Sequence, residues 1–208
     1  MRNRRIKKCP KCGSDRVAPI LYGLPVFDED LKRKIESEEI YLGGCCVGNA
    51  DPQFHCFACK KDIGTPPILQ SSHGVEDYRD IVTSVQFSDG GYFGGFDEVF
   101  FQKTQDGIKV SITPSFLGKK KLPIEREVSE EEWETLLDKL FCRLYIHEWK
   151  KTYNDYTVCD GEQWSLELRL IGNRQRNYQG SNAFPPCWSS LKRVFKSYLD
   201  ECPLLEEE

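Results

Sequence analysis

Two pairs of cysteines in the first third of the chain have the spacing of metal ligands. Cys9 and Cys12 form one Cys-x-x-Cys pair, and Cys56 and Cys59 form the other. Two residues between paired cysteines let both sulfurs of a tight turn reach one ion, and thiolates suit Zn²⁺. Four thiolates complete a tetrahedral shell and leave no position for water. We therefore expect one structural zinc ion that does not activate water for hydrolysis.

Other side chains compete for the same metal. The two pairs are separated by 43 residues, whereas paired zinc ligands are more often separated by about 15–20. Cys45 and Cys46 lie in this interval and are alternative ligands, and His55 is a weaker one. The sequence leaves open whether Cys45 or Cys46 replaces a predicted ligand, and a redox dithiol is the other interpretation of the pairs.

Lysines lie directly beside the paired cysteines, namely Lys8, Lys11, Lys60 and Lys61. Four thiolates around Zn²⁺ carry a formal charge of −2, so these lysines are explained by local charge compensation. That explanation weakens any argument from them for nucleic-acid binding.

The first eight residues form a basic arm that could contact nucleic-acid phosphates. The whole chain has a net charge of −4 at pH 7, and short charged tails are usually solvated. We therefore expect only weak, sequence-independent binding that disappears near physiological salt. The basic residues of the arm are Arg2, Arg4, Arg5, Lys7 and Lys8.

The pattern of apolar residues indicates a cytoplasmic protein without a membrane segment. No window approaches the roughly 18 consecutive apolar residues of a membrane-spanning helix. No apolar segment follows the N-terminal arginines, so we expect no secretory signal. The ten cysteines are therefore interpreted mainly as thiols and metal ligands, not as a disulfide framework.

Polar and aromatic residues in the second half could share one ligand cleft. Asp160 and Glu162 precede a predicted strand, and Asn182 follows its partner strand. Polar groups that converge with aromatic rings at one sheet edge are typical of small-molecule sites. The alternative is that Asp160 shapes a turn and Asn182 supports the following helix. The predicted cleft residues are Trp149, Tyr153, Asp160, Glu162, Trp164 and Asn182.

The sequence gives little support for catalysis, and we predict no catalytic residues. The only histidines are His55, His73 and His147, and none lies in a nucleophile or metal-hydrolase motif. The carboxylates of Asp160 and Glu162 are a candidate pair for acid–base work, but carboxylate pairs of this kind occur in most domains.

The N-terminal part is expected to be a zinc ribbon over residues 9–64. Asp28 should cap a short helix that places Leu31 and Ile35 on one face. Prolines, serines and a glycine without periodicity predict a linker over residues 65–74.

Residues 75–208 are expected to form a second, α+β domain. Alternating apolar residues predict three strands over 81–87, 99–101 and 108–112. Turns are expected at 88–91 and 105–107.

A helix should begin at a capping box formed by Ser129 and Glu132. Two more strands, joined by a turn at Gly172, and a final helix from Trp188 complete the order βββαββα. This order predicts a mostly antiparallel sheet of about five strands with both helices on one face. An apolar stripe supports the first helix: Trp133, Leu136, Leu137, Leu140, Phe141 and Leu144.

Residues 9–64 resemble a bacterial zinc-ribbon family of unassigned function. The similar pieces are Cys9–Ser14, residues 20–25, Leu42–Cys45 and Pro52. Cys46 departs from the pattern. The resemblance implies the zinc site and the extent of the module.

The second half resembles another uncharacterised bacterial domain through residues 90–95, 149–153, 160–164 and 180–185. Neither resemblance implies an activity.

The sequence supports three candidate functions, which we rank from the most to the least favoured. The first is a non-catalytic, zinc-containing binding protein of a bacterial cytoplasm, with another protein as partner. The second is nucleic-acid binding through the basic arm and the ribbon. The third is an enzyme acting at the Asp160/Glu162 edge.

Overall fold

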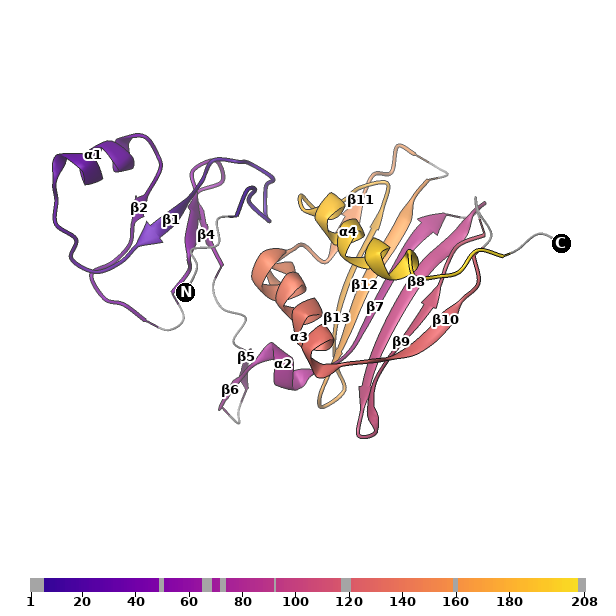
Figure 1. Cartoon of the computed structure of the whole chain (residues 1–208). Coiled ribbons are helices and arrows are strands. Elements are labelled where there is room, and N and C mark those ends of the chain that lie inside the picture. The colour runs from indigo at the N-terminus through magenta and orange to yellow at the C-terminus, as the bar shows by residue number, and fades with distance from the viewer. Residues whose placement is uncertain are drawn as a thin grey trace.

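The computed structural model describes residues 6–48, 51–64, 69–71, 74–91, 93–116, 121–158 and 161–205 of the 208-residue chain. Figure 1 shows a small N-terminal module beside a larger sheet that carries helices. Some residues singled out by the sequence lie outside the described part: Arg2, Arg4, Arg5, His73 and Asp160.

The N-terminal module contains a four-stranded sheet in the order β2-β1-β3-β4. β1 and β2 are parallel, and the other neighbours are antiparallel. Helix α1 (Glu29–Glu36) lies between β1 and β2, and the Asp28 side chain accepts a hydrogen bond from the Leu31 N–H at 2.8 Å. The predicted cap is therefore confirmed. The strands are β1 (Val17–Leu21), β2 (Tyr41–Leu42), β3 (Phe54–Cys56) and β4 (Lys61–Ile63).

The region between the two parts has some regular structure. Strands β5 (Leu69–Ser71) and β6 (Gly74–Glu76) form an antiparallel pair, and helix α2 (Tyr78–Ile81) follows. Part of the predicted linker is therefore paired in the structure.

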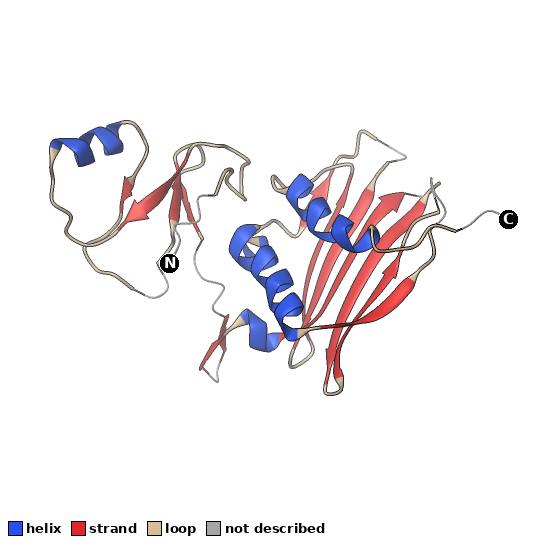
Figure 2. Ribbon diagram, viewed as in Figure 1, coloured by secondary structure: helices blue, strands red, loops and turns tan. Residues whose placement is uncertain are grey.

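The larger part is built on a seven-stranded sheet in the order β10-β9-β8-β7-β12-β13-β11. All neighbours are antiparallel except β11 and β13, which are parallel. Helices α3 (Glu130–Asp138) and α4 (Trp188–Leu199) cover one face (Figure 2). The strands are β7 (Val82–Gly91), β8 (Gly95–Thr104), β9 (Gly107–Thr113), β10 (Ile124–Val128), β11 (Thr152–Asn154), β12 (Gln163–Leu170) and β13 (Arg174–Ser181).

The α+β class agrees with the prediction, but the strand order differs from βββαββα. Strand β10 precedes the first long helix, and β11 follows it, so the order of strands and long helices in this part is ββββαβββα. Both missed strands are short, and β10 carries three charged residues. Their apolar signal is therefore too weak to predict a strand.

The glycine-rich stretch 88–91 is not the predicted turn. It continues β7, with Ser88 and Gly90 paired to β12 on one side and to β8 on the other. A central strand with both ladders filled tolerates glycines that would end an isolated strand.

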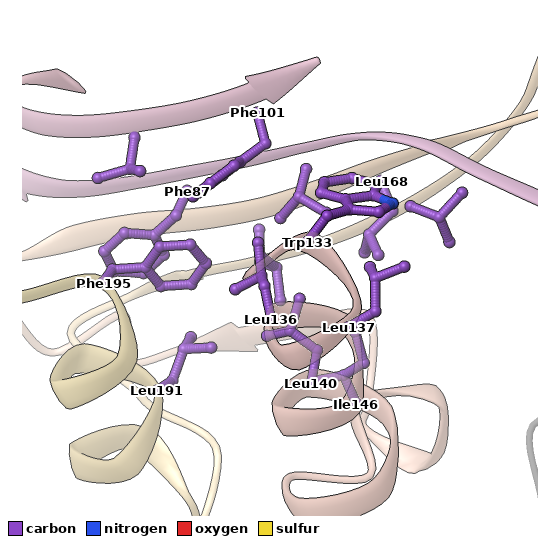
Figure 3. Packing of buried hydrophobic residues seen from close by; sticks show 14 of the residues in the cluster. Phe87, Phe101, Trp133, Leu136, Leu137, Leu140, Ile146, Leu168, Leu191 and Phe195 are labelled. Atoms are coloured by element: carbon purple, nitrogen blue, oxygen red, sulfur yellow. The ribbon is translucent and has the colours of Figure 1, made fainter. Parts of the chain in front are cut away.

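Two helices and the sheet enclose the main core. Helix α3 (Glu130–Asp138) continues into the π-helical segment η1 (Lys139–Arg143), and α4 (Trp188–Leu199) crosses the same face. Figure 3 shows the ring of Phe87 against that of Phe195, with centroids 4.3 Å apart and planes 4° from parallel. The predicted apolar stripe is buried throughout, which confirms it.

The capping box at the start of α3 is half formed. The Ser129 hydroxyl oxygen accepts a hydrogen bond from the Glu132 N–H at 3.1 Å, as expected. The Glu132 carboxylate instead pairs with the Arg126 guanidinium at 2.8 Å. The Glu132 side chain therefore binds Arg126 on β10 and does not cap the helix in return.

None of the helices in the described residues is long and apolar enough to cross a membrane.

Candidate metal centre

The four predicted zinc ligands meet in the structure. Two turns carry them: one precedes β1 and the other joins β3 to β4. All four Sγ atoms lie within 4.8 Å of one another, with Cys9 3.8 Å from Cys59 and Cys12 3.6 Å from Cys56. In a tetrahedron with Zn–S bonds of about 2.3 Å the sulfurs are about 3.8 Å apart. The cluster therefore fits a four-coordinate zinc ion.

Backbone N–H groups point at the first cysteine of each pair. Those of Lys11 and Cys12 bond to the Cys9 sulfur, and the equivalent groups of the second turn bond to the Cys56 sulfur. Burial nevertheless raises the pKa of Cys9 to about 12. Burial also opposes ionisation of Cys56, but the N–H groups lower its pKa below the ordinary value. A bound cation supplies the charge that full ionisation of such a cluster requires.

The residue after each cysteine pair has a left-handed backbone. Gly13 has φ +79° and Lys60 has φ +54°. Glycine adopts this conformation without steric cost, whereas a lysine does so under strain. The two turns are therefore built alike, although the second lacks the glycine.

The competing ligands lie outside the cluster. Cys45 and Cys46 are exposed, with their Sγ atoms 4.0 Å apart. The His55 ring stacks on that of Tyr41 at 3.7 Å, and its Nδ1 lies 2.6 Å from Asp62 Oδ1. Among the described residues, only the predicted four cysteines form a group of three or more metal-ligating side chains.

The metal cluster lies against the sheet domain (residues 77–205). The Tyr145 side chain is buried in the small apolar cluster that contains Cys9 and Cys56. The Glu148 carboxylate accepts a hydrogen bond from the Gly64 N–H at 2.7 Å.

The second Glu148 oxygen lies 3.3 Å from Lys11 Nζ. A lysine assigned from sequence to charge compensation thus also pairs with a carboxylate of the other domain. Segment 145–148 therefore links the metal-binding module to the sheet.

The predicted ligand-cleft residues divide between the core and the surface. Trp149 and Trp164 are buried, and their indole N–H groups donate to the carbonyls of Leu144 and Ala183, each at 2.9 Å. Tyr153 packs against the same core.

Glu162 precedes β12 and Asn182 follows β13, so the two residues lie together at one end of these paired strands. There the Asn182 N–H donates to the Glu162 carbonyl at 2.9 Å. Asn182 has φ +55°, so its backbone turns the chain there. Asp160, the proposed partner of Glu162, is outside the described residues.

An ionic cluster that the sequence did not indicate surrounds Glu162. Lys192 Nζ lies 2.9 Å from Glu162 Oε1 and 2.8 Å from Asp89 Oδ2. Asp89 is only 8% exposed, and its Oδ1 has no hydrogen-bond partner among the described residues. Burial, together with the nearby Glu162 carboxylate, raises the pKa of Asp89 to about 6.

Acid–base catalysts use buried carboxyl groups of this kind, and structural ion-pair networks contain them too. Asp89 was missed because it lies in the glycine-rich stretch that the sequence assigned to a turn. Phe87 and Asp89 are two residues apart on β7, and this alternation places both on the helix-covered face. Extending the predicted strand by two residues would therefore have predicted a buried Asp89.

No protein-family model matches the chain, and the comparison with curated proteins finds no match. The structure itself shows an α+β protein with a four-cysteine cluster suited to a metal ion.

Proposed function

We propose that the protein is a non-catalytic zinc-binding protein whose N-terminal module binds another protein. The observation that carries this proposal is a group of exposed apolar side chains on two loops of that module. Leu24 is 91% exposed, Val26 83%, Phe27 59% and Val47 76%. Gathered apolar side chains on a small module are typical of protein-binding surfaces.

The two loops adjoin each other. The Gly23 N–H donates to the Gly44 carbonyl at 3.1 Å, and a Cβ built on Gly23 would lie 4.0 Å from Val47. We call the surface formed by Leu24, Val26, Phe27 and Val47 the apolar loop surface. Neither loop has regular secondary structure. Side chains on such loops can settle into pockets of a partner without distorting the strands.

The charge beside this surface favours a basic partner. Residues 28–39 contain six acidic and three basic residues. The basic ones already pair within α1: Lys32 with Glu29, and Arg33 and Lys34 with Asp30. Arg16, outside this segment, pairs with Glu38, so two of the three surplus negative charges remain without a cation among the described residues. This remaining negative charge repels nucleic-acid phosphates and attracts lysine- or arginine-rich protein surfaces. We therefore propose a partner with an apolar pocket rimmed by cations.

Nucleic-acid binding is the second candidate, and its support is narrower. It depends on the basic arm, and of the five basic residues of that arm the structure describes only Lys7 and Lys8. Lys11, nearby, is engaged by Glu148. Five cations give micromolar binding at low salt and little at physiological salt.

The test is capture of partners from the source cell by the full-length protein, with one sample treated with nuclease. The variant carries Leu24→Ser and Phe27→Ser. The matched control, Ile171→Ser, changes an exposed apolar residue at the tip between β12 and β13. We expect one or more proteins to be retained by the wild type and the control, and lost by the variant, irrespective of nuclease. Removing two buried apolar anchors from an interface costs about 2–4 kcal/mol.

Two results would contradict the proposal. Capture that is unchanged in the double variant excludes the apolar loop surface as the binding site. Capture that disappears with nuclease promotes the nucleic-acid candidate. Zinc content of each variant, measured in parallel, confirms that the module remains folded.

A further inference from the structure

The seven-stranded sheet has one face that carries no long helix (Figure 2). A hollow on this face is lined by residues of five strands. Its volume is about 380 Å³, within the range of small-molecule sites, about 300–1,000 Å³. Side chains alternate across a strand, so residues next to buried core residues point to this open face. Gln163 and Ser165, for example, flank buried Trp164 on β12.

Strand register places the lining residues in two neighbouring rows. One row runs across five strands: Phe96 on β8, Gly90 on β7, Gln163 on β12, Ser181 on β13 and Asn154 on β11. Gly90 brings no side chain to this row. The row is therefore open between the Phe96 ring and the Gln163 amide.

The second row crosses the three adjacent strands β7, β12 and β13 through Ser88, Ser165 and Gln179. Its next position on β8 is Glu98, which does not line the hollow. The carboxylate thus borders the site without entering it.

The chemistry of the lining is polar and uncharged. It comprises three hydroxyls, three carboxamides and one aromatic ring, with Trp164 and Gly180 completing it. Among the described residues, no side-chain hydrogen bond engages Ser88, Ser165, Gln163 or Gln179. Each of these groups can both donate and accept.

The floor of the hollow is held rigidly. The Trp164 indole lies on the core side, where its N–H bonds to Ala183 and its ring packs 5.0 Å from that of Trp188. Sites that rest on strands with locked side chains keep their geometry better than sites on loops.

We propose that this hollow binds a neutral saccharide. A sugar presents several hydroxyls that donate and accept together, which the carboxamides and serines match. Its C–H face is apolar and fits the ring of Phe96. A phosphate or carboxylate ligand would require cationic partners, and no lysine or arginine lines the site. The proposal is independent of the apolar loop surface, which belongs to the other part of the chain.

Titration of the full-length protein with neutral and charged sugars tests the proposal. The neutral probes are methyl β-glucoside, methyl β-galactoside, N-acetylglucosamine and cellobiose, and the charged ones are glucose 6-phosphate and glucuronate. Amide resonances in two-dimensional NMR report binding even at millimolar affinity. We expect at least one neutral probe to shift the side-chain amide signals of Gln163 and Gln179, and the charged probes to bind more weakly.

Matched variants locate the site. Gln163→Ala and Gln179→Ala should each weaken binding about tenfold, the effect of losing one or two hydrogen bonds. Gln175→Ala is the control, because Gln175 is an exposed carboxamide on the same face of β13, four residues from Gln179. It should leave the affinity unchanged. All three side chains are exposed, so their truncation should not unfold the sheet.

The proposal is overturned if no neutral probe binds up to about 10 mM, a ceiling near the weakest useful affinity. It is also overturned if glucose 6-phosphate binds more tightly than the neutral sugars. Equal effects of Gln163→Ala and Gln175→Ala would place any sugar binding elsewhere, and this too would refute it.

Discussion

At the residue scale, the environment of Asp89 moves the ionisation of its carboxyl group toward neutral pH. It faces Lys192 on α4, Glu162 at the sheet edge and, directly across the strand pair, Asp97 on β8. Burial dominates and raises its pKa to about 6 from an ordinary value of 3.8. The folded state therefore binds this proton more tightly than the unfolded chain does.

We predict that this carboxyl group makes the protein less stable as pH rises from 4.5 to 7. The stabilisation from protonated Asp89 is fully present below 3.8, the pKa of this group in the unfolded chain. It is lost as pH rises through about 6, its pKa in the folded protein. The difference between a pKa of 3.8 in the unfolded chain and about 6 in the folded protein corresponds to roughly 1–3 kcal/mol of unfolding free energy. The Glu162 pKa is lowered, so its opposing contribution changes mainly below pH 4.5.

Urea unfolding of wild type and Asp89→Asn at several pH values measures this effect. Asparagine keeps the shape and does not titrate, so the difference between the two proteins should change across this window. Parallel stability curves would show that Asp89 keeps an ordinary pKa.

A second residue-scale prediction concerns Lys60, whose φ is +54°. Lys60→Gly should stabilise the N-terminal module by about 0.5–1 kcal/mol, because glycine relieves left-handed strain. Lys61→Gly is the control, since Lys61 begins strand β4 and glycine weakens a strand. Chelator titrations that follow unfolding of the module compare the three proteins. Stabilisation by both glycines, or by neither, would refute the explanation by backbone strain.

At the element scale, the sequence predicted long periodic elements well and short ones poorly. Helix α3 and strand β12 have strong apolar periods, and the burial pattern follows them. Strands β10 and β11 depend on neighbours for their pairing, which no local pattern reveals. The glycines of β7 suggested a turn, whereas strands on both sides hold them extended.

The same distinction applies to the candidate sites. The four cysteines were predictable because each pair is defined by local spacing. The Asp89–Glu162–Lys192 cluster joins β7, the start of β12 and α4, and the hollow joins five strands. Such sites depend on register and packing between distant segments, so sequence patterns name only single members, such as Glu162.

At the scale of the whole molecule, contacts of segment 145–148 couple the two parts. Glu148 is a buried carboxylate that accepts from the Gly64 N–H and pairs with Lys11. Glu148→Ala should lower the stability of the metal-loaded protein by about 1–3 kcal/mol, because the Gly64 N–H loses its partner. In a background with Cys56→Ser and Cys59→Ser, the same change should have little effect, because the module no longer holds metal and its contacts are lost. Equal destabilisation in both backgrounds would contradict this coupling.

The dependence of the two parts on each other should be unequal. The main core draws all its buried members from residues 78–202, whereas the core of the module includes Tyr145 from the sheet domain. A fragment of residues 75–208 should therefore fold and unfold cooperatively without metal, as a domain with a complete core does. In the full chain, Tyr145→Ala should weaken zinc retention against a chelator and leave the unfolding of the sheet domain nearly unchanged. Removing the ring takes about 2–4 kcal/mol of apolar burial from a module that has little core of its own. An unfolded 75–208 fragment, or loss of sheet-domain stability in Tyr145→Ala equal to the loss in the module, would mean that the two parts share one cooperative core.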